Sequence, residues 1–265
     1  MNFRYMVTTT LFSLGVCWAQ IGPATGASTQ QINAQNANNV CRVYFSTIKP
    51  GMNQQYEAGR KKHMQFHRAQ KDTWTWRTFL IETGDNAGNY VSSACGHPWK
   101  DFDEWEQRMG KADTADGQMN MTPYVQSQRN GFYVYRADLS LAPPNQPPAA
   151  MTSVTVYVLH PGTAPDFSAA IKKINEVLSK QPDWPKTSGW LQLVNGGEGP
   201  TFVLLTQRKN WGEFAPPAKT PMDLVTESLG KDAADQVFKT IRDSTAHLYT
   251  EAATYRPDLS YEPGP

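Results

Sequence analysis

Two histidines, His63 and His67, are the side chains of this sequence whose type and spacing best suit chemistry. They fall within residues 54–70, where apolar and polar residues recur with the period of a helix. At 100° per residue, positions four apart lie on one helix face, so both imidazoles share a face with Tyr56. Histidine changes charge near neutral pH, and a pair at this spacing can also share a metal ion. The pattern therefore predicts a polar site on one face of this helix.

A metal site is the less favoured of these interpretations. The usual catalytic zinc pattern places a glutamate between the two histidines and adds a third ligand, whereas Met64, Gln65 and Phe66 stand here. We therefore expect no metal. The alternative to a functional site is that both histidines are hydrogen-bonded residues at the edge of the core, where histidine is common.

A strand is predicted over residues 73–82, and it should run beneath this helix. Its side chains alternate, so Trp74 and Trp76 share one face and Arg77 and Phe79 share the other. The alternation does not say which face meets the helix. If the tryptophan face does, a flat aromatic ligand could stack beside the histidines; otherwise the tryptophans fill the contact between the two units of the chain described below. Aromatic pairs on strands belong to the core more often than to a ligand platform.

Composition and missing motifs exclude several functions. The 265 residues are 39% hydrophobic, and 25 basic side chains balance 24 acidic ones, so a sizeable core can form and nucleic acid is not an expected partner. No Gly-x-Gly-x-x-Gly, Walker-type loop, Gly-x-Ser-x-Gly elbow or Cys-x-x-Cys is present. Nucleotide hydrolysis, α/β-hydrolase chemistry and thioredoxin-type exchange are therefore disfavoured.

The first residues have the pattern of an export signal. Arg4 precedes an uncharged, mostly apolar run that ends near the small residue Ala19, which predicts a signal peptide over residues 1–19. Residues 20–39 are small and polar and predict a flexible tether. The mature chain should be exported, periplasmic or secreted, without a membrane span. A lipoprotein with Cys17 as the lipidated residue is the alternative.

An internal duplication organises the rest of the chain. Residues 90–102 align with residues 202–214 without a gap, and YRADLS at 135–140 matches YRPDLS at 255–260. Between the copies, APPNQPPAA at 142–150 predicts a semi-rigid proline-rich linker. The first unit should span residues 40–141 and the second residues 151–261.

Each copy has the predicted element order βαββαβ, the ferredoxin-like arrangement of one antiparallel sheet with both helices on one face. This makes the fold class α+β. Two such units each leave one sheet face uncovered, and they can bury these faces against each other. We expect two ferredoxin-like units packed sheet to sheet as a pseudo-dimeric α/β barrel.

The element order and the duplication resemble the dimeric α/β-barrel superfamily, here as a fused tandem pair similar to NIPSNAP-type and antibiotic-biosynthesis-monooxygenase-type proteins. The resemblance covers about residues 40–260 and implies a pocket between each sheet and its helices. In the first unit that pocket predicts a set of ligand-binding residues, namely Tyr56, Arg60, His63, His67, Trp74 and Trp76. In the second copy, Ile171, Ile174 and Leu178 align with the first copy's Arg60, His63 and His67.

The difference between the copies predicts that the first unit binds a small aromatic or apolar molecule, with the second mainly completing the fold. Whether a reaction follows is left open, as is further self-association. One alternative is a cofactor-independent monooxygenase or a haem-handling enzyme. In the haem-binding relatives the axial histidine lies on the second helix, whereas His97 lies before that helix begins. Otherwise no cofactor is expected. Another alternative is a non-catalytic interaction protein with a filled pocket.

Removal of Cys17 with the leader leaves two cysteines in the mature chain. In a ferredoxin-like sheet the first and third strands are antiparallel neighbours; Cys41 begins the first and Cys95 ends the third. We predict a Cys41–Cys95 disulfide, which a Cα separation above about 7 Å would exclude.

Overall fold

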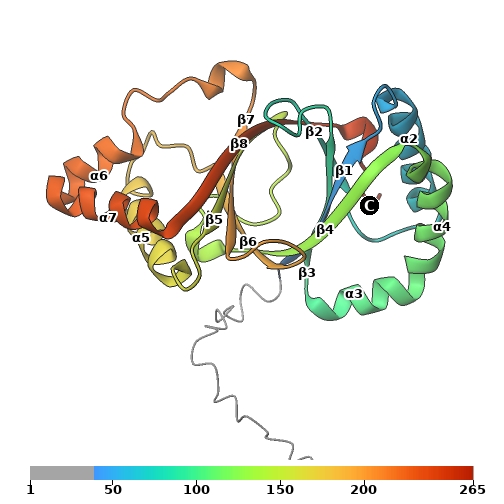
Figure 1. Ribbon diagram of the computed structural model, residues 1–265, viewed down its shortest axis with the longest axis horizontal. Helices are drawn as coiled ribbons and strands as arrows, with labels where there is room; N and C mark the ends of the chain where they lie inside the picture. The colour runs from blue at the N-terminus through green and yellow to red at the C-terminus, as the bar shows by residue number, and fades with distance from the viewer. Residues whose placement is uncertain (1–38, 265) are drawn as a thin grey trace, which may run out of the picture.

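The computed structural model describes residues 39–264, so the predicted signal peptide and nearly all of the predicted tether lie outside the described residues. The described chain forms a closed barrel of eight antiparallel strands with helices at its two sides (Figure 1). The strands are β1 Val40–Ile48, β2 Arg77–Ile81, β3 Tyr90–His97, β4 Val125–Tyr135, β5 Met151–Leu159, β6 Ser188–Asn195, β7 Thr201–Arg208 and β8 Thr245–Tyr255.

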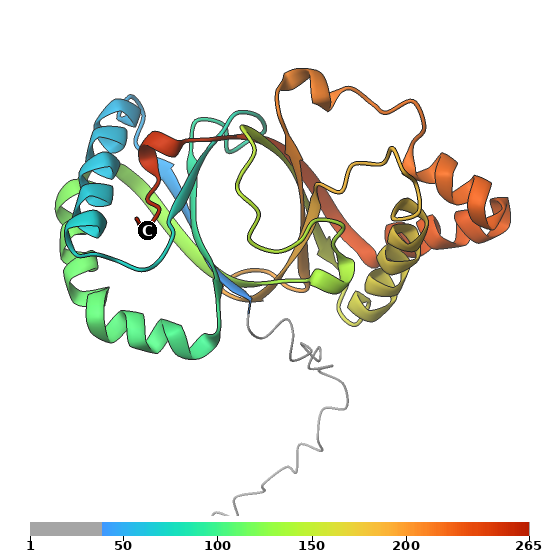
Figure 2. The same cartoon turned by 180° about the vertical axis from the view of Figure 1, so that it is seen from behind.

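The helices divide between the two units, as the predicted element order requires. Those of the first unit lie at one side of the barrel and those of the second at the opposite side (Figures 1 and 2). The first unit has α2 Asn53–Ala69, α3 Trp99–Trp105 and α4 Lys111–Asn120, with a π-helical turn over Glu106–Gly110 between the last two. The second has α5 Ala164–Leu178, α6 Pro221–Leu229 and α7 Lys231–Ser244.

The two sheets join into one barrel through their closing strands. The order around the barrel is β1-β3-β2-β8-β5-β7-β6-β4. Within this order β4 pairs with β1 of its own unit and β6 of the other, and β8 likewise pairs with β5 and β2. The predicted α+β fold of two packed ferredoxin-like units is confirmed. Their contact is a continuous hydrogen-bonded wall, which leaves no open sheet edge.

The tryptophan face of the second strand meets the helices. Trp74 and Trp76 are buried in one cluster with Met64 of α2 and Trp105 of α3, while Arg77 and Phe79 face the barrel interior. The strand is shorter than predicted, because Trp76 forms only an isolated bridge to Tyr261 of the C-terminal segment. Ordinary pairing of β2 therefore starts at Arg77.

The predicted disulfide is confirmed. Cys41 of β1 lies directly opposite Cys95 of β3 in the antiparallel register, and their Cα atoms are 3.9 Å apart. The bridge belongs to the first unit alone. No described helix is long and apolar enough to cross a bilayer.

Candidate functional site

The structure brings all six predicted ligand-binding residues into the layer between the first sheet and its helices. Each is at least nine-tenths buried: Tyr56, Arg60, His63, His67, Trp74 and Trp76. Other side chains and the C-terminal segment surround them. Arg60 Nε, for example, donates to the carbonyl of Leu259, and the ring of Tyr261 stacks on His67.

The Nδ1 atom of each histidine is hydrogen-bonded to an aspartate, and we call these two hydrogen bonds the outer contacts. His63 Nδ1 lies 2.7 Å from Asp116 Oδ1, and His67 Nδ1 lies 2.9 Å from Asp72 Oδ2. These distances are those of charge-assisted hydrogen bonds. A carboxylate only accepts, so in each pair the imidazole carries its proton on Nδ1.

The other nitrogens of the two rings turn toward a common point, which Asp113 also faces. His63 Nε2 and His67 Nε2 are 3.3 Å apart. Asp113 Oδ1 lies 3.3 Å from the first and 3.2 Å from the second. Two nitrogens and one carboxylate oxygen thus form a nearly equilateral triangle, and we call His63, His67 and Asp113 the inner triad.

Asp72 holds the surroundings of this triad in place. Its side chain is inaccessible to solvent and accepts hydrogen bonds from Trp76 Nε1 at 3.0 Å and from Trp105 Nε1 at 3.2 Å, besides the one from His67. Arg108 Nη2 lies 3.3 Å away as a further cation. A single carboxylate therefore fixes the tautomer of His67 and ties both indoles to the site.

The charges of the site support one another. Burial acts against a charge on His67, but the carboxylates of Asp113 and Asp72 outweigh it and raise its pKa. Burial also opposes ionisation of Asp72 and Asp113, yet the neighbouring imidazoles, and for Asp72 also the hydrogen bonds from Trp76 and Trp74, lower the pKa of each. Both carboxylates are therefore ionised at neutral pH.

Helix α4 supplies Asp113 and Asp116, three residues apart and so on one face. That helix lies very close to α2: a Cβ atom at Gly59 would fall 1.9 Å from the backbone oxygen of Asn120. The absence of a side chain at Gly59 allows the end of α4 to lie against α2, which brings both carboxylates to the histidines. Sequence reasoning missed Asp72, Asp113 and Asp116 because it sought partners on the histidines' own helix. The only signal was the i, i+3 spacing on α4.

The second unit has an apolar layer at the matching positions. Ile171, Ile174 and Leu178 of α5 are buried among aliphatic and aromatic side chains, including Val225 of α6 and Val237 of α7. The same helix–sheet layer therefore exists twice, and at these three matched positions the first copy has ionisable side chains where the second has aliphatic ones.

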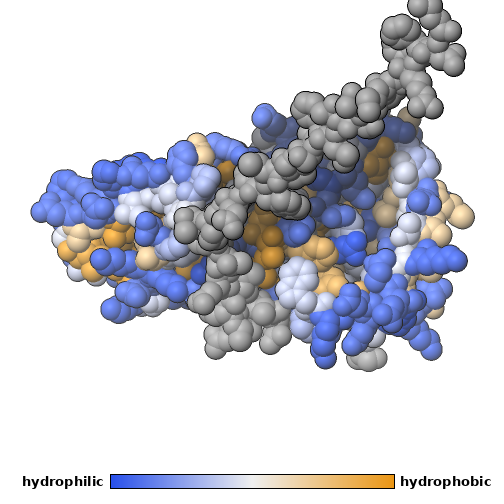
Figure 3. Space-filling model, turned by 60° about the horizontal axis from the view of Figure 1, so that its bottom comes forward, coloured by the Kyte–Doolittle hydropathy of each residue, from blue (hydrophilic) through white to orange (hydrophobic). Residues whose placement is uncertain are grey.

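A cavity of about 590 Å³ lies in the barrel interior, and none of the six predicted residues lines it. Inward-facing side chains of all eight strands surround it, with an apolar middle formed by Val43, Val154, Val156, Leu191, Val203 and Leu205. Apolar residues also reach the surface near the middle of the molecule in the view of Figure 3. The strand alternation in the sequence was compatible with such a cavity, but it did not show which faces turn inward.

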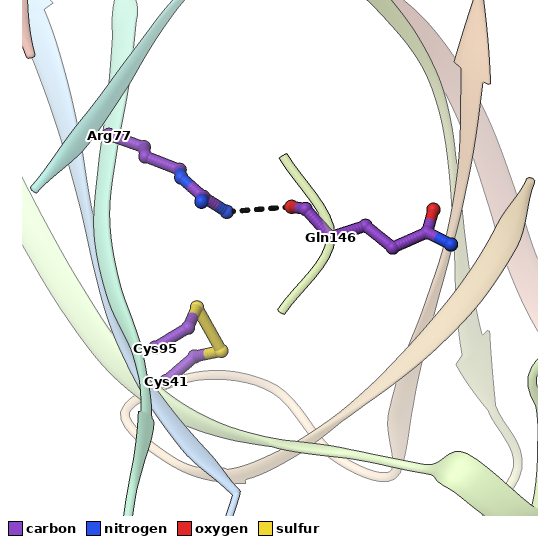
Figure 4. The surroundings of a disulfide bond; sticks show 4 residues. All are labelled: Cys41, Arg77, Cys95 and Gln146. Atoms are coloured by element: carbon purple, nitrogen blue, oxygen red, sulfur yellow. Dashed lines mark hydrogen bonds between the residues drawn. A yellow bond between two sulfur atoms is a disulfide. The ribbon is translucent and has the colours of Figure 1, made fainter. Parts of the chain in front are cut away.

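The proline-rich linker crosses one end of this cavity. Arg77 Nη1 donates to the backbone oxygen of Gln146 at 2.9 Å, and the Cys41–Cys95 disulfide projects into the same interior (Figure 4). Tyr135 also donates to a linker carbonyl, that of Ala142, at 2.6 Å. The linker therefore belongs to the cavity wall.

A second polar group lies toward the other end of the cavity. Arg129 is six residues before Tyr135 on β4, which moves it about 20 Å along the strand, away from the linker. Its guanidinium stacks 4.2 Å above the ring of Phe45. Burial raises the pKa of the nearby Tyr249. The interior is thus apolar in the middle and polar at both ends.

His97, considered as a haem ligand, faces away from this cavity. Its ring lies flat on Trp74 with the centroids 3.8 Å apart, and its Nδ1 is 3.9 Å from Asp101 Oδ2. The residue ends β3 just before α3, as its place in the sequence indicated. A stacked ring at this position does not present a free nitrogen to the barrel interior.

Solved structures with the same fold cover nearly the whole described chain. A candidate monooxygenase from Lactobacillus acidophilus NCFM superposes with a TM-score of 0.52 at 9% identity, covering 86% of this chain and 97% of its own. An anthrone oxidase-like protein gives 0.53 at 11% identity, over 86% and 94%. A candidate monooxygenase from Fusobacterium nucleatum subsp. nucleatum gives 0.51 at 11% identity, over 85% and 95%.

No protein-family model matches the chain, and no curated protein matches it by sequence. The structural similarity shows that the chain has the dimeric α/β-barrel fold, as the duplication predicted, in the form of a fused pair. At identities this low the similarity concerns the fold, because one fold hosts many activities.

Proposed function

We propose that this protein is exported and binds a small, mainly apolar or aromatic molecule inside its barrel. The observation that carries the proposal is the cavity of about 590 Å³ with its apolar middle and polar ends. Sites for small molecules commonly have volumes of about 300–1,000 Å³ and combine apolar walls with a few polar groups that orient the ligand.

The polar groups suggest what the ligand carries. Arg77 lies at the linker end and Arg129 toward the other end, while most of the wall between them is aliphatic. A flat apolar body with a carbonyl, hydroxyl or acidic group at one end would bury its ring among the valines and leucines and direct its oxygen to a guanidinium. This is the ligand class that we propose.

We propose a different place for the ligand from the helix–sheet pocket expected from the sequence. Beneath α2, the ring of Tyr56 packs on Tyr90, and the ring of His67 packs on Trp76. The barrel interior holds a cavity of about 590 Å³, so we assign the apolar ligand to it. The Cys41–Cys95 disulfide supports the proposed export, because such bridges persist in oxidising compartments.

Binding can be tested with the fluorescent probe 1-anilinonaphthalene-8-sulfonate, which has a flat apolar body and one acidic group. We expect saturable binding of one probe per chain, and we expect Val156→Trp, which fills the apolar middle, to abolish it. The matched control is Leu248→Trp on the adjacent strand β8, where the side chain is 49% exposed and absent from the cavity wall. Equal binding by both variants would show that the probe does not occupy the barrel.

Oxidation of an aromatic substrate is a second candidate function, favoured by the mainly apolar cavity together with the fold shared with an anthrone oxidase-like protein. Oxygen consumption with anthrone as the probe tests it. A rate above that of the buffer which disappears in Val156→Trp supports turnover in the barrel. A rate equal to that of the buffer leaves binding alone as the function.

A further inference from the structure

We propose that His63, His67 and Asp113 bind a divalent transition metal ion, zinc being the ion that their geometry fits best. The site lies between α2 and α4, apart from the barrel cavity, and none of its three ligands lines that cavity. The proposal therefore does not depend on the ligand proposed for the barrel.

The hydrogen bonds of the two histidines leave one nitrogen of each ring available to a cation. Because each Nδ1 proton is donated to an aspartate, each Nε2 of a neutral imidazole carries a lone pair. These two lone pairs and Asp113 Oδ1 all face one point. The Asp113 oxygen is buried there without a hydrogen-bond donor. When both imidazoles are neutral, these three acceptors repel one another, and a proton or a metal ion between them removes the repulsion.

The distances between the three atoms distinguish a shared metal ion from a shared proton. Charge-assisted hydrogen bonds span about 2.7–2.9 Å, as the two outer contacts of the histidines do. The three inner separations are 3.2–3.3 Å, longer than these outer contacts. Tetrahedral zinc with bonds of about 2.0–2.1 Å places its ligand atoms about 3.3–3.4 Å apart, because each pair subtends ~109°. The inner triad thus has the size of one face of a zinc tetrahedron.

The hydrogen bonds from the Nδ1 atoms of the two histidines to aspartates are also typical of a metal site. Metal-binding histidines usually donate their second N–H to a carboxylate, which fixes the ring and strengthens the ligand. Asp116 does this for His63, and Asp72 does it for His67. Both histidines lie at most 4% exposed, so neither ring can turn away without disturbing the core. The ligands are therefore oriented in advance.

The charges at the site call for a cation. Asp72, Asp113 and Asp116 converge on two imidazoles that are neutral when they ligate a metal. Arg108 contacts Asp72 but is 45% exposed, and Arg60 contributes a second, buried guanidinium near Asp113. A dication at the triad offsets the remaining negative charge. The second unit, with Ile174 and Leu178 in place of the histidines, has no comparable need.

Three protein ligands leave one position of a tetrahedron free for water or another small ligand. Asp113 is the most accessible member of the triad, with 22% of its side chain exposed, so the ion enters from the side of α4. Two histidines and one carboxylate also bind iron(II). Octahedral bonds of about 2.1 Å would bring the ligand atoms to ~3.0 Å, closer than observed, so the geometry favours zinc.

The first experiment measures zinc binding by the full chain after treatment with a chelator. Isothermal titration with zinc chloride should give one site per chain with a dissociation constant at or below about 1 μM, and zinc should raise the melting temperature. Cobalt(II) added in place of zinc should show the intense visible absorption of a tetrahedral site with nitrogen and oxygen ligands. A wild-type protein that binds neither ion overturns the proposal, whatever its variants do.

The variants locate the site. Asp113→Asn keeps the shape of the side chain but removes the anionic ligand, and we expect it to weaken zinc binding at least about 100-fold. Asp116→Asn alters only the outer contact of His63 and should weaken binding about 10- to 100-fold. The control His160→Gln changes an exposed histidine of the second unit and should leave binding unchanged. Wild-type affinity in a folded Asp113→Asn protein would place any bound zinc elsewhere and refute the assignment.

Discussion

Gly59 of α2 meets the backbone oxygen of Asn120 at the end of α4 so closely that a Cβ atom at Gly59 would lie 1.9 Å from it. Real Cβ atoms do not approach backbone oxygens to this distance, so any side chain at Gly59 forces the helices apart. The contact lies one helical turn before His63 and at the end of the helix that carries Asp113 and Asp116. The packing of these helices therefore also determines whether carboxylates and histidines meet.

Substitution Gly59→Ala should destabilise the protein by about 1–3 kcal/mol, because overpacking a close contact costs this much. Thermal and urea unfolding measure the loss. Gly117→Ala on α4 is the matched control: its Cβ would meet Met121 at an ordinary 3.4 Å. In a helix, alanine is favoured over glycine by up to about 1 kcal/mol. A similar change in both variants would contradict the close contact at Gly59.

Substitution Asp72→Asn should lower the free energy of unfolding by about 3–5 kcal/mol, because it removes the charge from a fully buried carboxylate paired with His67. An amide has one acceptor oxygen and cannot serve the indoles of Trp76 and Trp105 together with the imidazole. Urea unfolding followed by tryptophan fluorescence is the measurement. Asp232→Asn, at an exposed position on α7, should change stability little. Equal stability of the two variants would disprove the role of Asp72.

Replacing both Cys41 and Cys95 by alanine should cost about 2–4 kcal/mol, since the disulfide closes a long loop and so restricts the unfolded chain. The melting temperature under oxidising conditions reports the loss. A reductant should destabilise the wild-type protein by a comparable amount and leave the double variant unchanged. If the reductant lowers both melting temperatures equally, its effect does not come from this bridge.

Stability should decrease below about pH 4.5 partly through Glu57. Its hydrogen bonds to Arg256, which also pairs with Asp258, lower the pKa of Glu57 from the usual 4.5. A carboxylate whose pKa is lower in the folded state than in the unfolded state stabilises the fold above the unfolded pKa, and this contribution is lost as the pH falls through the folded pKa. Unfolding measured between pH 7 and pH 2 should show a shallower acid decline for Glu57→Gln. A decline as steep as that of the wild type would show that Glu57 contributes nothing.

The architecture could be predicted because the same order of elements occurs twice in the sequence. Two copies of one element order, joined by a proline-rich linker, indicate two similar units, and the order βαββαβ places the first and third strands side by side. The disulfide follows from that neighbourhood, since Cys41 and Cys95 occupy matching ends of the two strands. The hydrogen bonds that close the barrel did not follow, because β4 and β8 pair across the units and local periodicity carries no information on such pairs.

The candidate sites were predictable only in part, for a similar reason. Spacing within one helix places His63 and His67 together, and the structure confirms that they are adjacent and buried. Their aspartate partners come from α4 and from the loop before β2, which only the packed fold brings near. The barrel cavity depends on which face of every strand turns inward. The alternation around Trp74 and Arg77 left that choice open, and the helices above the sheet decide it.

The linker over residues 142–150 joins two similar units in one chain, whereas a homodimer forms such a barrel from two separate chains. In a homodimer every substitution occurs twice, once in each subunit, so a cluster of buried charges would have to be accommodated on both sides of the barrel. Covalent fusion removes that constraint. One half can evolve ionisable groups such as the inner triad while the other retains the aliphatic packing of Ile174 and Leu178 and stabilises the whole. Carrying both halves in one chain thus lets each half have its own side chains in the helix–sheet layer.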